Sequence, residues 1–382
     1  MVPESALLTF DETGNQLTPA HPGAKELRHG LSVVKQIGDT LWVANDETIT
    51  LERLRRQPGP APAWADHRRF HLHPLLALPA PPDAAPGDAP EIDIEGLAYD
   101  AAGRNLWLVG SHSLKRKKAD LGKKDAKNST RLATVSADGN RYLLARLPLE
   151  PDADGLPAPV RLAPDGRHAA RLRGDTTGNE LTRELATDPH LGPFLAIPGK
   201  DNGFDIEGLA LTPGGRLLLG LRGPVLRGWA VVLEVALEPD AADPATLRLR
   251  PIGPEGRLYR KHFVQLRGLG IRDLYAVGDD LLLLAGPTMD LDAPVTVFRW
   301  QGGAAPAPAP ADTFTFTTSG RLRPVLEVPV GHNAHLGTDR AEGICRLTDP
   351  PGALLVVYDA ADPARFREAA GVLADVFAVP EA

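Results

Sequence analysis

Short apolar runs separated by polar turns recur along the chain in groups. Each group opens with a glycine followed by apolar residues, and a polar turn and a second apolar run come next. The opening segments are "HGLSVV" (Gly30), "EGLAYD" (Gly96), "EGLALT" (Gly208), "RGLGIR" (Gly268) and "EGICRL" (Gly343). Apolar runs this short, bounded by turn residues, are typical of β-strands. The pattern predicts five repeats of one β-structured unit.

Each group contains further strand candidates. The second runs, such as "NLWLVGSHS", are followed by a third, such as "VTVFRW", and four of the groups have a fourth, such as "RPVLEVPV". Four short strands per repeat are the sequence signature of a propeller blade. We predict an all-β fold, a β-propeller of five four-stranded blades that forms a single domain over residues 1–382. Two β-sandwich domains are the alternative, but no linker-like boundary divides the chain.

The last group ends after its third strand candidate, at "DVFAVPEA". At the other end of the chain, "SALLTF" (Ser5–Phe10) precedes the first group and has no other assignment. Pairing this run with the last blade removes an exposed sheet edge, which is otherwise prone to aggregation. We therefore predict that the N-terminal strand closes the ring.

The interval between Gly96 and Gly208 is the longest of the five. It contains "GDTTGNELTRELATDPHLGPF", in which Asn179 suits the N-cap of a short helix that carries Leu181 and Leu185 and ends before Pro189. We predict an insertion over residues 158–200 with this short helix. A sixth, degenerate blade is the alternative, because residues 158–175 also fit a hairpin.

Composition narrows the class of protein. The chain has 43% hydrophobic and 24% charged residues, with Gly 38 and Pro 37, which favours a turn-rich globular fold. Its net charge of −7 argues against a nucleic-acid binder, since phosphate contacts need a surplus of Lys and Arg. No apolar run has the length of a membrane helix. We expect a cytoplasmic protein that binds a small anionic ligand or a protein partner, with no nucleic acid and no membrane.

Four segments carry a resemblance to a known family: "IDIEGLAYD", "GDTTGNEL", "PGKDNGFDIEGLAL" and "LLLGLRGPVLRGWAVVLEV". Together they resemble the bacterial family called domain of unknown function 3616, over most of the chain. The Glu-Gly-Leu/Ile signature is similar, more loosely, to that of the esterase-like phytase and SdiA-regulated propeller families. The first resemblance implies fold and kinship without an established activity, and the second suggests phosphoester chemistry.

The residue before each repeated glycine is expected to face the central channel of the propeller. These residues are His29, Glu95, Glu207, Arg267 and Glu342. Carboxylates that converge on one axis repel one another and need protonation, an opposing cation or a metal. We predict that Glu95, Glu207 and Glu342 bind Ca²⁺ or Mg²⁺, which prefer oxygen ligands, while Arg267 and His29 compensate charge. The alternative is a structural plug of salt bridges.

The repeated glycine has a simpler explanation. Where inner strands converge there is little room for a side chain, and glycine lets two backbones approach closely. We predict that its repetition reflects packing.

The loops at one end of the ring collect polar side chains, including Asp46 and Asp359. In "LRGPVLRGW" two arginines lie among glycines and apolar residues, a setting that suits bidentate binding of carboxylate or phosphate. In the alternative interpretation, each of these arginines forms a salt bridge with a neighbouring carboxylate and binds no ligand. The candidate substrate-binding residues are Arg222, Arg227, His112, Lys200, Asn202 and His332. The basic run Lys115–Asn128 is interpreted as a solvated loop, with attraction of an anionic ligand as its second use.

Common catalytic signatures are absent from the sequence: there is no Gly-x-Ser-x-Gly, Walker loop or His-Glu-x-x-His. The single Cys345 is expected to be a small buried residue. Two hypotheses follow. The first is a divalent-metal-dependent hydrolase of a phosphoester-like small molecule at the central channel. The second is a non-enzymatic propeller that binds a ligand or a protein.

Overall fold

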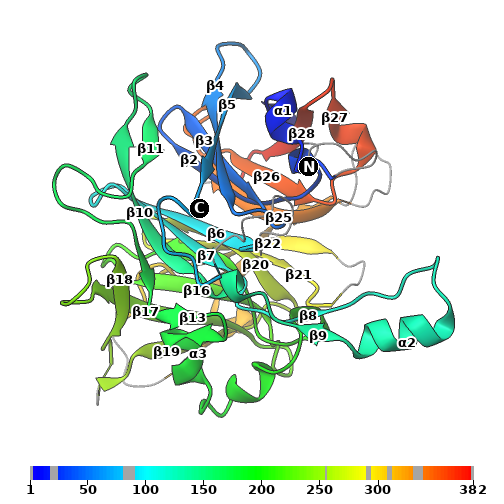
Figure 1. Cartoon of the computed structure of the whole chain (residues 1–382), viewed down its shortest axis with the longest axis vertical. Helices are drawn as coiled ribbons and strands as arrows, with labels where there is room; N and C mark the ends of the chain where they lie inside the picture. The colour runs from blue at the N-terminus through cyan, green and yellow to red at the C-terminus, as the bar shows by residue number, and fades with distance from the viewer. Residues whose placement is uncertain are drawn as a thin grey trace.

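A computed structural model of the chain shows an all-β protein with a few short helices (Figure 1). It describes residues 3–17, 25–80, 91–253, 256–289, 294–307, 312–329 and 339–379. Among these residues, no helix is long and apolar enough to cross a membrane. The strands form antiparallel runs around a nearly closed, barrel-shaped centre, so the expectation of a propeller-like all-β fold is confirmed at this level.

Each antiparallel run starts at an inner strand and proceeds outwards. The first comprises β2 (Leu31–Ile37), β3 (Thr40–Asn45), β4 (Thr50–Arg56) and β5 (Ala63–His71). The second comprises β6 (Ile94–Asp100), β7 (Asn105–Gly110), β10 (Leu144–Pro151) and β12 (Ala170–Leu172). The third comprises β15 (Asp205–Leu211), β16 (Leu217–Gly223) and β17 (Ala230–Pro239), and β17 pairs with both β18 (Thr246–Arg250) and β19 (Tyr259–Val264).

The last two runs complete the circuit. The fourth comprises β20 (Gly270–Val277), β21 (Asp280–Gly286), β22 (Val295–Trp300) and β24 (Leu322–Val328). The fifth comprises β25 (Arg340–Arg346), β26 (Leu354–Asp359), β28 (Gly371–Phe377) and the N-terminal strand β1 (Glu4–Thr9). Strand β1 is antiparallel to β28 along its whole length, as the sequence predicted. The two ends of the sequence therefore share one sheet.

The remaining elements are short. The α-helices are α1 (Glu12–Asn15), α2 (Asp125–Ala133) and α3 (Glu180–Leu185). The short strands are β8 (Lys115–Arg116), β9 (Val135–Ser136), β11 (Pro157–Pro159), β13 (Gly174–Asp175), β14 (Gly178–Asn179), β23 (Thr313–Thr315) and β27 (Phe366–Arg367). Helix α3 lies where the sequence placed a helix: the Asn179 side chain accepts a hydrogen bond from Thr182 N at 3.0 Å, and Leu181 and Leu185 are buried. The preceding segment supplies β12 to the second run.

The inner strands β2, β6, β15, β20 and β25 contact one another in a ring. Glycines make the close approach: a Cβ on Gly96 would lie 2.5 Å from Leu209 Cβ of the next inner strand. Likewise, a Cβ on Gly343 would lie 3.0 Å from Val33 Cα. Such contacts leave little or no room for a side chain, so the packing explanation is confirmed for Gly96 and Gly343, and for Gly208, where a Cβ would lie 2.9 Å from Leu274 Cγ. It is wrong for Gly268, which lies in a turn at φ +85° with nothing within 4 Å of a Cβ.

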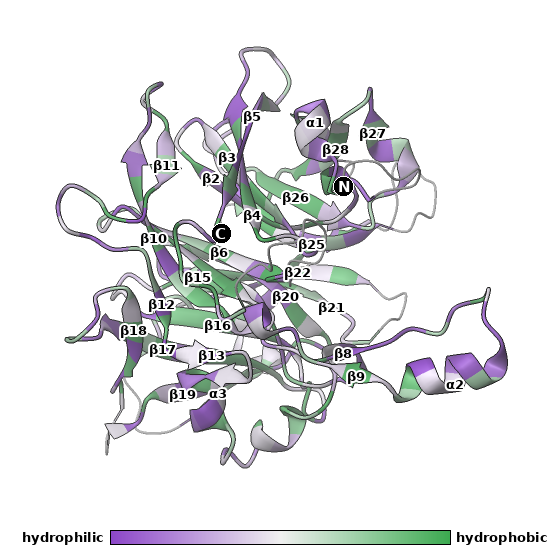
Figure 2. Cartoon of the chain, in the orientation of Figure 1, coloured by the Kyte–Doolittle hydropathy of each residue, from purple (hydrophilic) through white to green (hydrophobic). Residues whose placement is uncertain are grey.

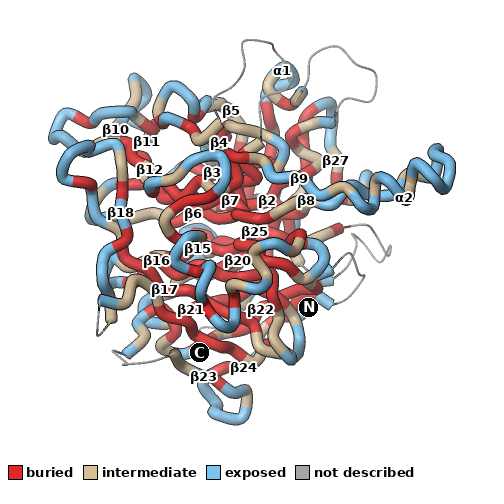
Figure 3. The backbone as a smooth tube through the Cα atoms, turned by 60° about the horizontal axis from the view of Figure 1, so that its bottom comes forward, coloured by how far each residue is buried: buried red, intermediate tan, exposed pale blue. Residues whose placement is uncertain are grey.

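Apolar side chains fill the space between neighbouring sheets. One cluster joins β1, β3 and β28 to β25 and β26 through residues such as Leu8, Val43 and Val356. Another packs α3 against β15, β16 and β17. Figure 2 shows hydrophobic residues concentrated on the inner strands, and Figure 3 shows that these strands are buried while the connecting loops are exposed. The core therefore holds the inner strands rigidly where they meet.

Candidate functional site

Every inner strand has a β-bulge near its start, at the same point of the ring. The pairing of each inner strand with its neighbour skips one residue there. The skipped residues are Ser32, Glu95, Glu207, Arg272 and Glu342. A bulge redirects the side chain of the extra residue, and bulges are frequent beside functional sites. The fold thus brings three glutamates and one arginine to equivalent positions.

A cavity of about 620 Å³ lies over this part of the ring, among the loops. Its acidic lining residues are Glu26, Asp46, Glu47, Glu91, Asp93, Glu95, Asp205, Glu207, Glu342 and Asp359. Its basic lining residues are Lys25, Lys115, Arg116, Lys118, Arg141, Lys200, Arg222 and Arg340, with His29 beside them. Carboxylates therefore outnumber Lys and Arg, ten to eight.

The repeated sequence "DIEGLA" explains two pairs of these carboxylates. In each copy the aspartate lies two positions before the glutamate, and the β-bulge at the glutamate breaks the regular alternation of the strand, so that Asp93 lines the cavity with Glu95, and Asp205 with Glu207. All four side chains line the cavity, although only the glutamates were predicted as site residues. The aspartate two positions before each glutamate was the signal that sequence reasoning did not use.

Two of the predicted metal-binding glutamates are held by arginines. Arg222 Nη1 donates to Glu207 Oε1, and Arg222 Nε donates to Thr288 O at 3.0 Å. Arg272 Nη1 donates to Glu342 Oε1. All four charged side chains are buried, so each pair places opposite charges together away from water. These two glutamates are therefore arranged as in the alternative interpretation, in which salt bridges to arginines neutralise the carboxylates of the ring.

Glu95 differs from the other two. It is 8% exposed, and among the described residues it has no hydrogen-bond or ion-pair partner. Burial, reinforced by the charges of Asp93 and Glu207, raises the pKa of Glu95 well above its ordinary value. Glu207 Oε2 is also buried without a hydrogen-bond partner. Glu95 and Glu207 therefore leave carboxylate oxygens in the acidic lining that accept no hydrogen bond from the described residues.

Other carboxyl groups of the cavity are similarly perturbed. Burial and the charge of Glu207 raise the pKa of Asp205 to about 8. Burial and the charge of Glu342 raise the pKa of Asp359 to about 6. Burial and the charge of Asp359 raise the pKa of Asp46 well above its ordinary value. We call Asp46, Asp93, Glu95, Asp205, Glu207, Glu342 and Asp359 the acidic cluster. In the absence of a bound cation, Asp205 keeps a proton near neutral pH.

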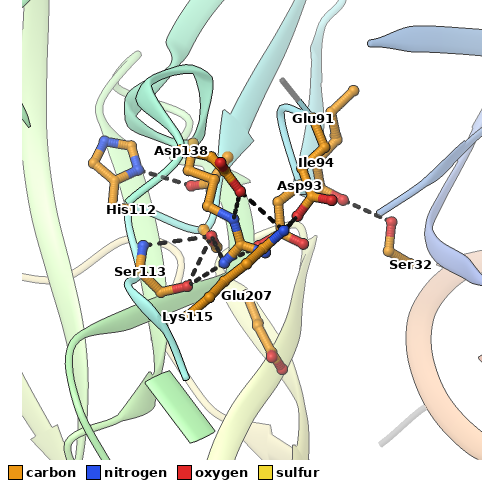
Figure 4. Close-up of polar contacts among 12 residues, drawn as sticks. Ser32, Glu91, Asp93, Ile94, His112, Ser113, Lys115, Asp138 and Glu207 are labelled. Atoms are coloured by element: carbon orange, nitrogen blue, oxygen red, sulfur yellow. Dashed lines mark hydrogen bonds and ion pairs between the residues drawn. The ribbon is translucent and has the colours of Figure 1, made fainter. Parts of the chain in front are cut away.

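Arg141 organises one side of the cavity. Its guanidinium lies 2.6 Å from Glu91, 2.9 Å from Asp93 and 2.8 Å from Ser113 Oγ. Lys115 adds ion pairs to Glu91 and to Asp138, the latter at 2.9 Å. Figure 4 shows Glu91, Asp93, Lys115 and Asp138 converging there, and Ser32 reaching Ile94 of the neighbouring inner strand. Asp93 is thus neutralised on this side, whereas Glu95 is not.

The structure changes the assignment of the compensating charges. Arg267 is exposed on a turn before β20, and Arg272 takes the ring position expected for it. His29 lines the cavity next to Glu26, at 3.5 Å, but it precedes β2, and Ser32 occupies the ring position. In the first and fourth inner strands, the residue after the bulge is Val33 or Asp273, whereas the other three strands have glycine there. The glycines that the sequence pattern selected in these two groups, Gly30 and Gly268, therefore lie a few residues before the ring position.

The predicted substrate-binding residues separate into two groups. Lys200 and Arg222 line the cavity, and Arg222 is already paired. Arg227 is exposed and does not line it. Asn202 Oδ1 accepts a hydrogen bond from Val225 N at 2.9 Å, which fixes a loop. His332 lies outside the described residues.

His112 is part of the structure beneath the cavity and does not line it. It is buried, with Nδ1 2.7 Å from Gly110 O and Nε2 2.6 Å from Asn179 Nδ2. Burial lowers the pKa of His112 to about 4. The neutral ring, with Nδ1 donating to Gly110 and Nε2 accepting from Asn179, satisfies both contacts and ties the second run to the cap of α3.

The predicted metal site has no counterpart in the geometry. The described residues contain no group of three His, Cys, Asp or Glu side chains placed to hold a metal ion. Arg222 and Arg272 each hold Oε1 of their glutamate, so binding of Ca²⁺ or Mg²⁺ by all three glutamates would have to use the other carboxylate oxygen of Glu207 and Glu342. The metal site stays a prediction.

The buried carboxyls predict that stability decreases as pH rises. The pKa of Asp205 is about 8 in the folded protein against 3.8 ordinarily, so between pH 7 and 8 the folded chain holds a proton that the unfolded chain has lost. As the pH rises, each such group lowers the free energy of unfolding by about 1.4 kcal/mol per pH unit, until the pH passes the pKa of that group in the folded protein. Urea denaturation from pH 7 to 9 in EDTA measures this slope. Asp205→Asn is expected to flatten it, and a wild-type stability that does not change over this range would contradict the prediction.

The geometry can be set beside known proteins. Residues 30–375 match the family described as Protein of unknown function (DUF3616), and the chain belongs to this family. The comparison with curated proteins gave no match.

Solved structures similar to the chain include several propellers. The β-propeller domain of Cps50 (Swd1) from Myceliophteria thermophila is 14% identical over 86% of this chain and 80% of that one, with a TM-score of 0.31. The WD40 β-propeller domain of Doa1 is 10% identical over 94% and 95%, with a TM-score of 0.32. Glutaminyl cyclase from Myxococcus xanthus is 12% identical over 99% and 100%, with a TM-score of 0.34. Similarities of this size carry no information about activity.

Proposed function

We propose that this member of the DUF3616 family is a five-bladed propeller that binds a small ligand in its cavity, with a cation at the acidic cluster. The observation that carries the proposal is Glu95, a buried carboxylate without a partner among the described residues. Beside it, Glu207 Oε2 is buried and unsatisfied. A buried charge without compensation is costly, and a bound cation removes that cost as well as a proton does.

The cation that fits best is a hard divalent ion. The cluster offers carboxylate oxygens only, which suit Ca²⁺ or Mg²⁺, whereas Zn²⁺ favours His and Cys ligands. Asp46, Glu95 and Asp359 are free of arginine partners among the described residues, and each has a raised pKa caused first by burial. We therefore place the cation nearer to these three than to the Glu207 and Glu342 oxygens held by arginine.

The ligand also carries an anionic group in this proposal. The more exposed lining residues include cations, among them Lys25, Arg116 and Lys200. Burial and the charge of Arg222 act to lower the pKa of Lys200, but Glu342, Glu207 and Asp359 raise it further, so its ammonium group stays charged. A cation at the acidic cluster and basic side chains near the opening of the cavity suit an anionic ligand that binds the metal, such as a phosphoester. They also suit a zwitterion.

A metal-dependent hydrolase of phosphoesters is the second candidate. The observation that favours it is Asp205, whose pKa is raised to about 8, because a carboxyl that keeps its proton near neutral pH can act as a general acid. The non-enzymatic binder needs no such group. Turnover of a panel of simple phosphoesters in Ca²⁺ or Mg²⁺, lost in Glu95→Gln, would support the hydrolase.

Cation binding is expected to stabilise the wild type. Metal-stripped protein should show a rise in melting temperature with CaCl₂ or MgCl₂, reversed by EDTA, and an ion at about 100 times its Kd should add about 2.7 kcal/mol. Binding should strengthen as pH rises from 6 to 8, because the ion displaces protons from groups such as Asp359, whose pKa is about 6. Isothermal titration calorimetry measures the affinity directly.

Two variants separate specific binding from general salt effects. Glu95→Gln should abolish the stabilisation, because it removes the uncompensated carboxylate. Glu327→Gln changes an exposed glutamate on β24, outside the cavity, and should respond like the wild type. The proposal is rejected if metal-stripped wild type shows neither heat nor a thermal shift with either ion at any pH tested.

A further inference from the structure

A segment with no role in the core projects from the side of the molecule beside the cavity. It consists of β8, α2 and β9, and we call residues 115–136 the arm. Figure 1 shows α2 extending well beyond the body of the protein, connected only through β8 and β9. The sequence predicted a solvated loop here. The segment is indeed exposed, but it forms two short strands and a helix.

The arm is ordered by its own hydrogen bonds. Asn128 Oδ1 accepts from Asp120 N at 2.9 Å, and Asn128 Nδ2 donates to Asp120 O at 3.0 Å. Arg131 Nε donates to Lys118 O at 2.7 Å, which fixes the helix to the segment that leads out from β8. A segment that only connected two strands would not need these contacts. The arm is therefore a preformed element.

Nothing in the described part of the chain covers the arm. Helix α2 has no buried residue. Leu121 is fully exposed, and Leu132 and Val135 are 48% and 40% exposed, which makes them three of the few large apolar side chains left open to solvent (Figure 3). An isolated helix of this length is marginal in water, and a surface that covers its apolar residues stabilises it.

Charge indicates what kind of surface that is. The arm has eight Lys and Arg and two Asp, a net charge of +6. The whole chain has a net charge of −7, so the rest of it has −13. Lys124, Lys127 and Arg131 are spaced i, i+3 and i+7 and lie on one face of the helix. A basic helix joined to an acidic body is complementary to a second copy of the same molecule.

We propose that the arm docks on the body of a second copy of this chain, and that two copies exchange arms reciprocally. Reciprocal docking uses the same pair of surfaces twice and closes into a two-fold dimer. The root of the arm also lines the cavity: Arg116 Nε donates to Asp201 Oδ2 at 2.6 Å, and Lys115, Arg116 and Lys118 face the opening. Dimer formation thus holds in place the segment that forms one wall of the cavity.

Sedimentation velocity of the full chain tests this at low and high salt over a range of protein concentrations. The wild type should sediment with twice the mass of one chain at low salt and dissociate as salt is added, because screening weakens the charge contact. The variant Lys124→Glu, Lys127→Glu, Arg131→Glu should sediment as a monomer. Since α2 buries no side chain, this variant keeps the fold of the body and loses only the Arg131 hydrogen bond to Lys118 O within the arm, and circular dichroism and the melting temperature verify this.

A matched control has the same change in net charge away from the arm. Arg250→Glu, Arg267→Glu, Arg323→Glu reverses three exposed arginines and should remain dimeric. A wild type that is monomeric at every concentration in low salt overturns the proposal, and so does a control variant that dissociates as fully as the arm variant. A monomeric wild type that retards a short DNA duplex would assign the arm to polyanions instead.

Discussion

Removing Met1–Phe10 is expected to cause aggregation or a large loss of thermal stability. Strand β1 pairs with β28 from Glu4 to Thr9, and its Leu8 and Phe10 are buried between the sheets. Burying two such side chains contributes about 3–6 kcal/mol, a large part of the stability of an ordinary domain. Their loss also leaves β28 as an open edge, which invites pairing between chains. Differential scanning fluorimetry and light scattering of the truncated protein measure both effects.

Point variants test the same strand without changing its length. Leu8→Ala removes a side chain with no exposed surface and should cost about 2–5 kcal/mol. Ser5→Ala changes an exposed position of the same strand and should have little effect. A truncated protein that is monodisperse and melts at the wild-type temperature would show that β1 does not stabilise the ring.

Local pattern was sufficient for most of the strands and for the closure. Apolar runs such as "NLWLVG" and "DVFAV" became β7 and β28 because a strand between two sheets buries both faces and reads as a continuous apolar run. Closure by β1 followed from counting strands in the last group. The strand assignments use features that lie within a few residues of each other, whereas the closure, which pairs Glu4–Thr9 with Gly371–Val376, needed the strand count of the last group.

Strands stabilised by distant charges were not visible in this way. Strand β19 reads "YRKHFV", yet its Lys261 is buried on Asp188, and His262 lies 3.1 Å from Glu234. Its charges are compensated only by residues far along the chain, so its sequence alone resembles a surface loop. Conversely, "RLATVSAD" has the alternation of a strand, but it forms the end of α2 and β9 in the arm, away from the sheets.

The sequence predicted the types of residue that form the site more accurately than it predicted their positions in the chain. The glutamates of "DIEGLA" and "EGICRL" line the cavity, and each is the extra residue of a β-bulge next to a close-packed glycine. The arginine of the ring was assigned to the wrong residue. A bulge depends on the pairing of two strands, and in "RGLGIRDL" the glycine after Arg267 matched the repeat, whereas Arg272 precedes Asp273. Arg141 comes from a short 3-10 helix, Gly139–Tyr142, and no repeat or motif in the sequence marked it as a site residue.

Replacing Arg272 is expected to be among the most damaging single substitutions in the protein. Its guanidinium is 3% exposed, donates to Glu342 and reaches Pro287 O at 3.3 Å. Arg272→Gln leaves Glu342 buried without its cation, close to the other carboxylates of the acidic cluster. Breaking a buried ion pair from one side costs about 3–5 kcal/mol. Urea denaturation measures this loss, and Arg267→Gln, on the exposed turn, should stay within about 0.5 kcal/mol of wild type.

A double-mutant cycle distinguishes the lost pair from lost packing. Adding Glu342→Gln to Arg272→Gln removes the uncompensated charge, so the double variant should recover part of the stability, with a coupling of about 0.5–3 kcal/mol. If packing alone matters, the double variant is no more stable than Arg272→Gln. Added Ca²⁺ gives a further readout, because it should stabilise Arg272→Gln more than wild type when the freed Glu342 becomes an additional oxygen ligand. Equal calcium shifts together with zero coupling would mean that Arg272 does not neutralise the acidic cluster.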